Sequence, residues 1–337
     1  MMNIPRKGAR KTKGTIFLLR RWFFILYLPP REAWIQASLG GRYRMKNQRL
    51  KRKMVPFVFL APFLGMFIIF RVWPIISAFY LSFQEVKGIG TSKFVGITNY
   101  AVLFGDRRFV SSFLTTSYYT IATLLTLIPI PLILAVLLFE RRTPGKEVFR
   151  TLIFLPSLTS LVVVGTVFRL ILADTGGLVN AVLGLFGVAP LRWLLLPELA
   201  VPSLAILALW RWTGMNIVYF SSGLTTIPPE IYEAAKIDGA QSLALFRYIT
   251  LPLIKPIIIF VVTISIIGGY QVFVEPYILY PGGRTPGEAG LTVAVYLYRT
   301  AFRNFNMGYA AAIGVALAGI IFAVSLAQFQ FSGFFKK

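Results

Sequence analysis

Residues 233–240 read Glu233-Ala234-Ala235-Lys236-Ile237-Asp238-Gly239-Ala240, and Ile249-Thr250-Leu251-Pro252 follows Gly239 after nine intervening residues. This segment is a short polar interruption between two long apolar runs. Its fixed positions are Glu-Ala-Ala, three residues, Gly, nine residues and Ile-x-Leu-Pro, which is a specific spacing. The segment therefore decides how the rest of the chain is interpreted.

The local chemistry of this segment predicts two short helices. Pro228-Pro229-Glu230 suits a helix start, because proline is tolerated in the first turn and an acid there faces the positive end of the helix dipole. Gly239 stands where the chain must turn, and glycine reaches positive φ without steric cost. A second helix follows, with Leu245, Phe246 and Ile249 on one face. We expect a hinged pair of helices that offers a small apolar and acidic surface.

Composition places the chain among membrane proteins. Hydrophobic residues make up 56% of it, charged residues 14%, and the mean hydropathy is +0.71, whereas about a quarter of the residues in a soluble domain are charged. The chain has no Cys and no His, which removes thiolate chemistry and the usual general base. It also lacks the Gly-x4-Gly-Lys-Ser/Thr phosphate loop. We therefore expect neither an enzyme active site nor a cofactor on this chain.

Six apolar segments are long enough to cross a bilayer as helices, which takes about 20 residues each. They are Val55–Phe83, Ser112–Phe139, Thr151–Ala173, Leu199–Gly223, Pro256–Val274 and Met307–Ser332. The predicted fold class is all-α, a polytopic membrane protein with six transmembrane helices. We divide the chain into a basic extension, residues 1–54, and a six-helix domain, residues 55–337, with the polar loop at 224–255.

The basic residues predict the orientation. The first 54 residues carry 15 of the 35 Lys and Arg residues, and further basic residues follow the second and fourth segments and end the chain. These parts share one side, which we assign to the cytoplasm together with both termini and the 224–255 loop. The opposite loops hold a more diluted set: Lys87, Lys93, Arg107, Arg108, Arg192, Arg284, Arg299 and Arg303. The net charge of +23 thus reflects topology and lipid headgroups rather than nucleic-acid binding.

The N-terminal extension has two interpretations. Residues 15–28 are apolar but interrupted by Arg20 and Arg21, which suits a helix lying in the membrane interface. Alternatively, the natural start is Met45, and a short basic tail leads directly into the first segment. The sequence leaves both open.

The 233–252 spacing resembles the cytoplasmic coupling loop of permease subunits of binding-protein-dependent ABC importers. The resemblance covers about Met54 to Phe331. Over this range the chain is similar to the first permease subunit of the maltose and glycerol-3-phosphate type carbohydrate importers. Further matching segments are Phe94–Tyr100, Gly176–Asn180, Trp212–Gly214, Tyr298–Phe302 and Met307–Ala312. The outer segment Pro281–Gly287 and the arginines within the apolar segments depart from that pattern.

The resemblance implies a division of labour among several proteins. The loop would dock into a separate ATPase through Glu233, Ala234, Ala235, Asp238 and Gly239. The partners implied are a second related permease, two ATPase subunits that bind ATP and Mg²⁺, and an extracytoplasmic solute-binding protein, in the cytoplasmic (inner) membrane of a bacterium or archaeon. Transport would proceed by alternating access.

Three arginines lie within the apolar segments. Arg71 and Arg169 fall near the outer interface, where the side chain snorkels. Arg211 lies about 18 Å into its segment, and no acid on this chain appears at matching depth. Such a charge is a functional hypothesis: it either pairs with the second permease or lines a water-filled cavity, or it binds an anionic solute such as a uronic-acid sugar.

Other polar and aromatic side chains are candidates for the solute path, since carbohydrate sites combine aromatic faces with a few hydrogen-bonding groups. With Arg211, the candidates are Trp212, Asn216, Tyr219, Ser265, Tyr270 and Gln271. The alternative for each is a role at the bilayer interface or between helices.

The predicted function is the translocation subunit of an ATP-driven carbohydrate importer, with an oligosaccharide or an acidic sugar as cargo. The alternative is a subunit of an ion-gradient-driven secondary transporter, which would need inverted repeats and intramembrane acids. The sequence does not identify the cargo.

Overall fold

The computed structural model describes residues 56–57, 59–86, 92–139 and 145–333. The N-terminal extension, with its interfacial helix and the alternative start at Met45, lies outside the described residues. The chain divides into two units, residues 1–74 and 75–337, and each is described by itself.

The described part of the first unit is helical. A helix over Phe59–Leu81 has the length and composition of a membrane span and runs on into the second unit. It contains the π-helical turn η1 (Ile68–Val72) and α4 (Trp73–Leu81). Arg71 lies exposed in η1.

A small hairpin follows α4 in the second unit. Strands β1 (Gln84–Val86) and β2 (Ser92–Phe94) pair antiparallel, and α5 (Thr98–Gly105) follows. The Asn99 side-chain amide donates to the carbonyl oxygens of Ser82 and Gln84, at 2.9 Å each. The two hydrogen bonds tie α5 to β1 and to Ser82 just before it. They give the Phe94–Tyr100 segment a structural role.

Helix α6 (Arg107–Leu127) has the burial pattern of a membrane helix. Its buried face carries Ser112, Thr115, Thr116, Thr120 and Thr123. Most of these hydroxyls donate to carbonyl oxygens three or four residues earlier. Its exposed residues include Val110, Leu114, Ile121 and Leu125. Small polar residues inside and large apolar residues outside are the reverse of a soluble helix and suit a lipid environment.

One predicted segment is bent rather than straight, and a second bend comes directly before another predicted segment. The Thr151–Ala173 prediction corresponds to α8 (Lys146–Leu158) and α9 (Leu161–Ile171), which meet at 102°. The helix α15 (Lys255–Tyr270) is preceded by the helical stretch Ser242–Leu253, bent by 69° from it. Pro156 inside α8 and Pro252 before α15 remove backbone donors near these breaks.

The remaining helices follow the predicted apolar segments and the loops between them. They are α7 (Pro129–Phe139), α10 (Leu178–Leu185), η2 (Pro197–Leu199), α11 (Ala200–Leu224), α16 (Val274–Leu279), η4 (Pro281–Gly283), η5 (Pro286–Glu288), α17 (Val293–Phe302) and α18 (Met307–Phe331).

When the helices of the structure are judged by their length and composition, the number of membrane spans does not reach the six predicted. Three helices among the described residues are long and apolar enough to cross a membrane, or up to five if each bent pair is one span. Helix α11 has 25 residues but is not among them, and it carries Arg211 and Asn216 in its interior. The fold is nevertheless predominantly helical, as predicted.

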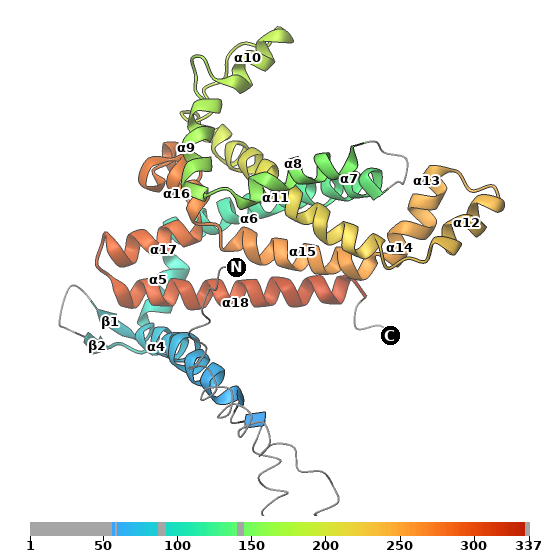
Figure 1. Ribbon diagram of the computed structural model, residues 1–337. Coiled ribbons are helices and arrows are strands. Elements are labelled where there is room, and N and C mark those ends of the chain that lie inside the picture. The colour runs from blue at the N-terminus through green and yellow to red at the C-terminus, as the bar shows by residue number, and fades with distance from the viewer. Residues whose placement is uncertain (1–55, 58, 87–91, 140–144, 334–337) are drawn as a thin grey trace, which may run out of the picture. The chain divides into compact units, whose positions relative to one another are not determined.

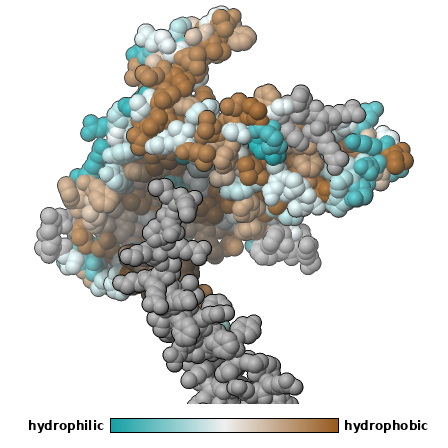
Figure 2. All heavy atoms as spheres, viewed as in Figure 1, coloured by the Kyte–Doolittle hydropathy of each residue, from teal (hydrophilic) through white to brown (hydrophobic). Residues whose placement is uncertain are grey.

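Three buried clusters hold the second unit together. Helix α11 packs against α6, α7 and α8, while α15 packs against α6 and α18. Figure 1 shows α17 and the β1–β2 hairpin at one end of this unit and α12–α13 at the other. Figure 2 shows hydrophobic residues over much of the visible surface, with hydrophilic ones gathered partly at the α12–α13 end.

Candidate functional site

The predicted coupling loop forms two short helical stretches joined at Gly239. Helix α12 covers Pro229–Ile237, and a second stretch consists of α13 (Ser242–Leu245), η3 (Phe246–Thr250) and α14 (Leu251–Leu253). The Gly239 amide donates to the Lys236 carbonyl at 3.1 Å, and the Ala240 amide donates to the Ala235 carbonyl at 2.9 Å. With Gly239 at φ +84°, this is a Schellman motif, in which the left-handed residue ends the helix. The hinge predicted from the sequence is confirmed.

The loop exposes both apolar and acidic side chains. Ile237 is 86% exposed, Leu243 76% and Tyr248 73%. Of the predicted docking residues, Glu233, Ala234, Asp238 and Gly239 are exposed, and Ala235 is half-buried. Exposed apolar side chains grouped in this way are compatible with an interaction surface, and the docking role of the loop stays a prediction.

Side chains of the loop pack against the helical core. The Tyr232 hydroxyl lies 3.0 Å from the Thr250 hydroxyl, and buried Thr250 in turn donates to the Leu245 carbonyl at 3.3 Å. Tyr232 and Phe246 both pack against the core cluster that contains Phe220 and Ile254. Packed side chains therefore connect α12 to α11 and α15.

Arg211 is buried in α11 and is already engaged within the chain. Its Nη1 donates to the Thr159 carbonyl at 2.6 Å and to the Pro156 carbonyl at 3.3 Å. Both carbonyls lie at the end of α8; the Pro156 carbonyl also accepts from the Thr159 amide at 3.2 Å, so Arg211 is a second donor to it. A cation there also complements the negative end of the helix dipole.

Arg211 also has an acidic neighbour, which corrects the expectation that no acid lies at its depth. Glu275, buried at the start of α16, interacts electrostatically with Arg211. The Arg211 guanidinium carbon lies 5.2 Å from the centre of the Trp212 ring. The α15–α16 turn brings Glu275 back toward α11, and a count of residues along a straight helix could not reveal this.

The other candidate path residues lie between helices. Asn216 donates to the Leu127 carbonyl at the α6–α7 junction at 2.8 Å, and the Tyr270 hydroxyl lies 3.1 Å from that of Ser117 on α6. Tyr219 packs edge-on against Phe260. Ser265 is half-buried and Gln271 exposed. Arg211 and Trp212 are the members of this set for which the described residues show a contact with each other. A common path that the whole set lines stays a prediction.

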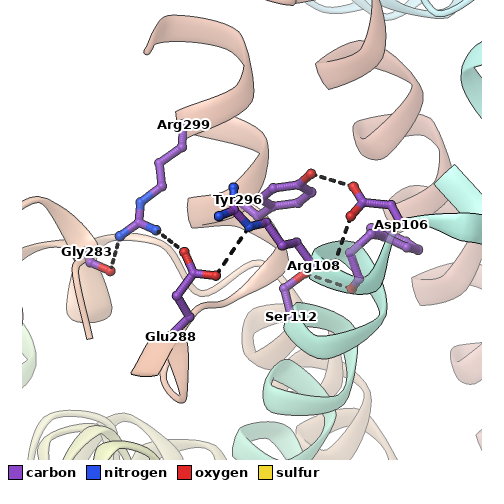
Figure 3. Close-up of polar contacts among 8 residues, drawn as sticks. Asp106, Arg108, Ser112, Gly283, Glu288, Tyr296 and Arg299 are labelled. Atoms are coloured by element: carbon purple, nitrogen blue, oxygen red, sulfur yellow. Dashed lines mark hydrogen bonds and ion pairs between the residues drawn. The ribbon is translucent and has the colours of Figure 1, made fainter. Parts of the chain in front are cut away.

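The sequence interpretation missed a pocket of about 310 Å³ that several arginines line. Arg108, Arg284, Arg299 and Arg303 line it together with Glu288. Figure 3 shows Arg108 and Arg299 on the Glu288 carboxylate. The four arginines were among the basic residues assigned to the opposite loops. Because they lie far apart in the sequence, their convergence in one pocket could not be recognised from it.

Comparison with known proteins fits this geometry. Residues 100–333 match the family model described as binding-protein-dependent transport system inner membrane component. The arabinooligosaccharides transport system permease protein AraP of Bacillus subtilis is 42% identical over 85% of this chain and 90% of its own length. The lactose transport system permease protein LacF of Rhizobium radiobacter is 33% identical over 81% and 92%.

Among solved structures, a bacterial ABC transporter involved in the import of the acidic polysaccharide alginate matches with a TM-score of 0.74. The match has 25% identity and covers 86% of this chain and 99% of that one. The fold is thus that of the type I importer permeases, and the family favours this assignment over an ion-gradient-driven transporter. The chain belongs to the family of binding-protein-dependent transport system inner membrane components.

Proposed function

We propose that this chain is one of two permease subunits of an ATP-driven carbohydrate importer that works by alternating access. A separate ATPase, which binds ATP and Mg²⁺, docks on the 224–255 loop at the cytoplasmic face. A second related permease and an extracytoplasmic solute-binding protein complete the assembly. Both termini lie in the cytoplasm.

The observation that carries this proposal is the construction of the loop. Glu233 and Asp238 present charge beside the exposed Ile237, on a helix that the Schellman turn at Gly239 ends. The Tyr232–Thr250 contact links that surface to the helices that would move. An ordinary connector between spans needs neither the exposed apolar residues nor the anchoring.

The cargo class rests on the relatives. The two compared permeases are named for arabinooligosaccharide and lactose transport, and this chain aligns with most of their length. A neutral oligosaccharide is therefore the first cargo to test, and a uronic-acid oligosaccharide is the second, because the compared alginate transporter imports an acidic polysaccharide.

The test uses two glycines in the same backbone motif. Gly239 has φ +84° and Gly187 has φ +75°, and a Cβ at either position would meet no atom within 4 Å. At Gly187 the same pair of hydrogen bonds ends α10. Gly239→Val and Gly187→Val therefore impose the same backbone strain at two separate places in the unit.

We expect Gly239→Val to abolish copurification of the ATPase and ATP-dependent uptake of a radiolabelled arabinooligosaccharide, with the subunit still inserted in the membrane. Gly187→Val should retain ATPase binding. Equal ATPase binding by the two variants would contradict the proposed docking site.

A further inference from the structure

The arginine pocket lies at the end of the second unit opposite the coupling loop. Its residues come from the start of α6, the η4–η5 segment and the end of α17. Figure 1 shows α17 at one end of α18 and α12–α13 beyond the other. If the loop faces the cytoplasm, as proposed above, the pocket faces the extracytoplasmic side.

The pocket is strongly positive. Four arginines and one glutamate line it, which leaves three positive charges in excess. Glu288 lies 3.4 Å from Arg299 Nη1 and 3.6 Å from Arg108 Nε. One carboxylate thus serves two guanidinium groups at distances longer than a good charge-assisted hydrogen bond. No ion pair of Arg284 or Arg303 with an acid is seen in the described part of the chain.

Glu288 is held in an unfavourable backbone conformation. Its φ is +59°, in the left-handed region that residues other than glycine rarely adopt. Such strain persists where surrounding contacts impose it and gathers at functional sites. The surrounding fold therefore holds the Glu288 carboxylate in place, although the backbone conformation of Glu288 is energetically unfavourable.

Arg299 is the least exposed of the four and is incompletely paired. Its side chain is 15% exposed, its Nη2 donates to the Gly283 carbonyl at 2.7 Å, and its buried Nε has no hydrogen-bond partner among the described residues. Burial lowers the pKa of Arg299, and Arg303, Arg284 and Arg108 lower it further, while Glu288 opposes them. An additional anion would relieve this repulsion.

Asp106, the nearest other acid in Figure 3, is already committed. Its Oδ2 accepts hydrogen bonds from the hydroxyls of Tyr296 and Tyr309, at 2.5 and 2.6 Å, and its Oδ1 caps α6 by accepting from the Arg108 amide at 2.9 Å. It holds the pocket wall in place and does not neutralise the arginines.

We propose that this pocket binds a carboxylate group brought from outside the chain, which joins or displaces Glu288 between Arg299 and the unpaired Arg284 and Arg303. Guanidinium groups suit this role because their planar donors match carboxylate oxygens. The carboxylate belongs either to an acidic saccharide or to an acidic side chain of the solute-binding protein. The inference deepens the proposed function, on which its placement at the outer face rests.

The test measures ligand binding to the purified full-length chain in nanodiscs by saturation-transfer NMR. The probes are glucuronate, glutarate and, as the neutral match to glucuronate, glucose. The test variant is Arg284→Gln with Arg303→Gln, and the control is Arg192→Gln, whose exposed arginine pairs with Asp174 and is not among the pocket residues. Thermal unfolding of each variant verifies that it is folded.

We expect both carboxylates to bind the native chain and to lose about tenfold in affinity in the double variant, since two charge-assisted contacts are removed. The control should bind as the native chain does, and glucose should not bind. If glucuronate binds more tightly than glutarate, the carboxylate comes from an acidic saccharide. If the two bind equally, it comes from an acidic side chain of the solute-binding protein. Both results support a carboxylate site in this pocket.

Absence of carboxylate binding, or binding that the double variant leaves unchanged, would overturn the inference. The proposed importer function is assessed separately by ATP-dependent uptake of a neutral oligosaccharide into cells that make the native chain and its partner subunits. Uptake without carboxylate binding would remove the carboxylate site and leave the importer in place.

Discussion

Arg211 Nη1 lies 2.6 Å from the carbonyl oxygen of Thr159, at the break between α8 and α9. The cation therefore donates to the Thr159 carbonyl at the 102° bend, where the helical ladder of α8 ends. In a membrane, an unsatisfied carbonyl is costly, so this contact explains why a charge is tolerated deep in α11.

Arg211→Gln should destabilise the fold and lower transport of all cargoes equally. Loss of a buried charged donor costs about 1–3 kcal/mol, and Arg211→Lys should lose less because an ammonium can still reach one carbonyl. Thermal unfolding in detergent and uptake of neutral and uronic-acid oligosaccharides measure the two effects. Selective loss of acidic-sugar uptake would instead place Arg211 in contact with solute.

Gly214 allows α11 to approach α8 closely. A Cβ at this position would lie 2.2 Å from the Ile153 carbonyl oxygen and 2.6 Å from the Phe154 Cα, both in backbone that cannot rotate away. Gly214→Ala should therefore destabilise the protein by about 1–3 kcal/mol.

The control for Gly214 is Gly184→Ala in α10, where a Cβ would meet nothing within 4 Å. That substitution should stabilise its helix by about 0.5–1 kcal/mol. The comparison is made by thermal unfolding, and equal midpoints for the two variants would contradict the packing explanation.

Asp106 predicts a pH dependence of stability. Burial raises the pKa of Asp106, but hydrogen bonds from Tyr296 and Tyr309 and from the amides of Arg108 and Phe109 bring it below the usual 3.8. A carboxyl whose pKa is lower in the folded state stabilises the protein above the unfolded pKa and ceases to do so as the pH falls through the folded value.

Asp106→Asn should therefore destabilise the protein by about 1–3 kcal/mol at pH 7, and the deficit should shrink only below pH 3.8. Thermal unfolding of the native and variant proteins at pH 7 and pH 3 measures this. A deficit that grows with acidification would show that the sign is wrong.

Tyr232→Phe tests the link between the coupling loop and the core. The substitution removes one hydroxyl that contacts Thr250 and leaves the ring packed. We expect ATPase binding to persist and ATP-dependent uptake to fall several-fold. Without the Tyr232–Thr250 contact, movement of α12 with the docked ATPase is transmitted less completely to α15. Tyr248→Phe, at a side chain 73% exposed, should leave uptake unchanged, and equal effects of the two would argue against the link.

The sequence predicts local features of this fold well. The Gly239 hinge follows from proline, acid and glycine positions within a dozen residues, and α18 (Met307–Phe331) nearly coincides with the predicted span. Both depend on neighbours in the chain, which helix signals capture.

Features that depend on distant contacts were not predictable. The break at Thr159 is stabilised by Arg211, which lies far along the chain, and Glu275 approaches Arg211 only because α16 turns back. The arginine pocket likewise gathers residues from three separate segments. Periodicity and composition carry no information on such pairings.

Cysteine labelling tests the central claim most directly, because the chain has no native cysteine. Asp238→Cys lies on the coupling loop, and Arg192→Cys lies in a loop predicted to face the opposite side. An impermeant maleimide should label residue 192 in intact cells and residue 238 only in inside-out vesicles, where added ATPase should protect it. Labelling of residue 238 in intact cells would contradict the account.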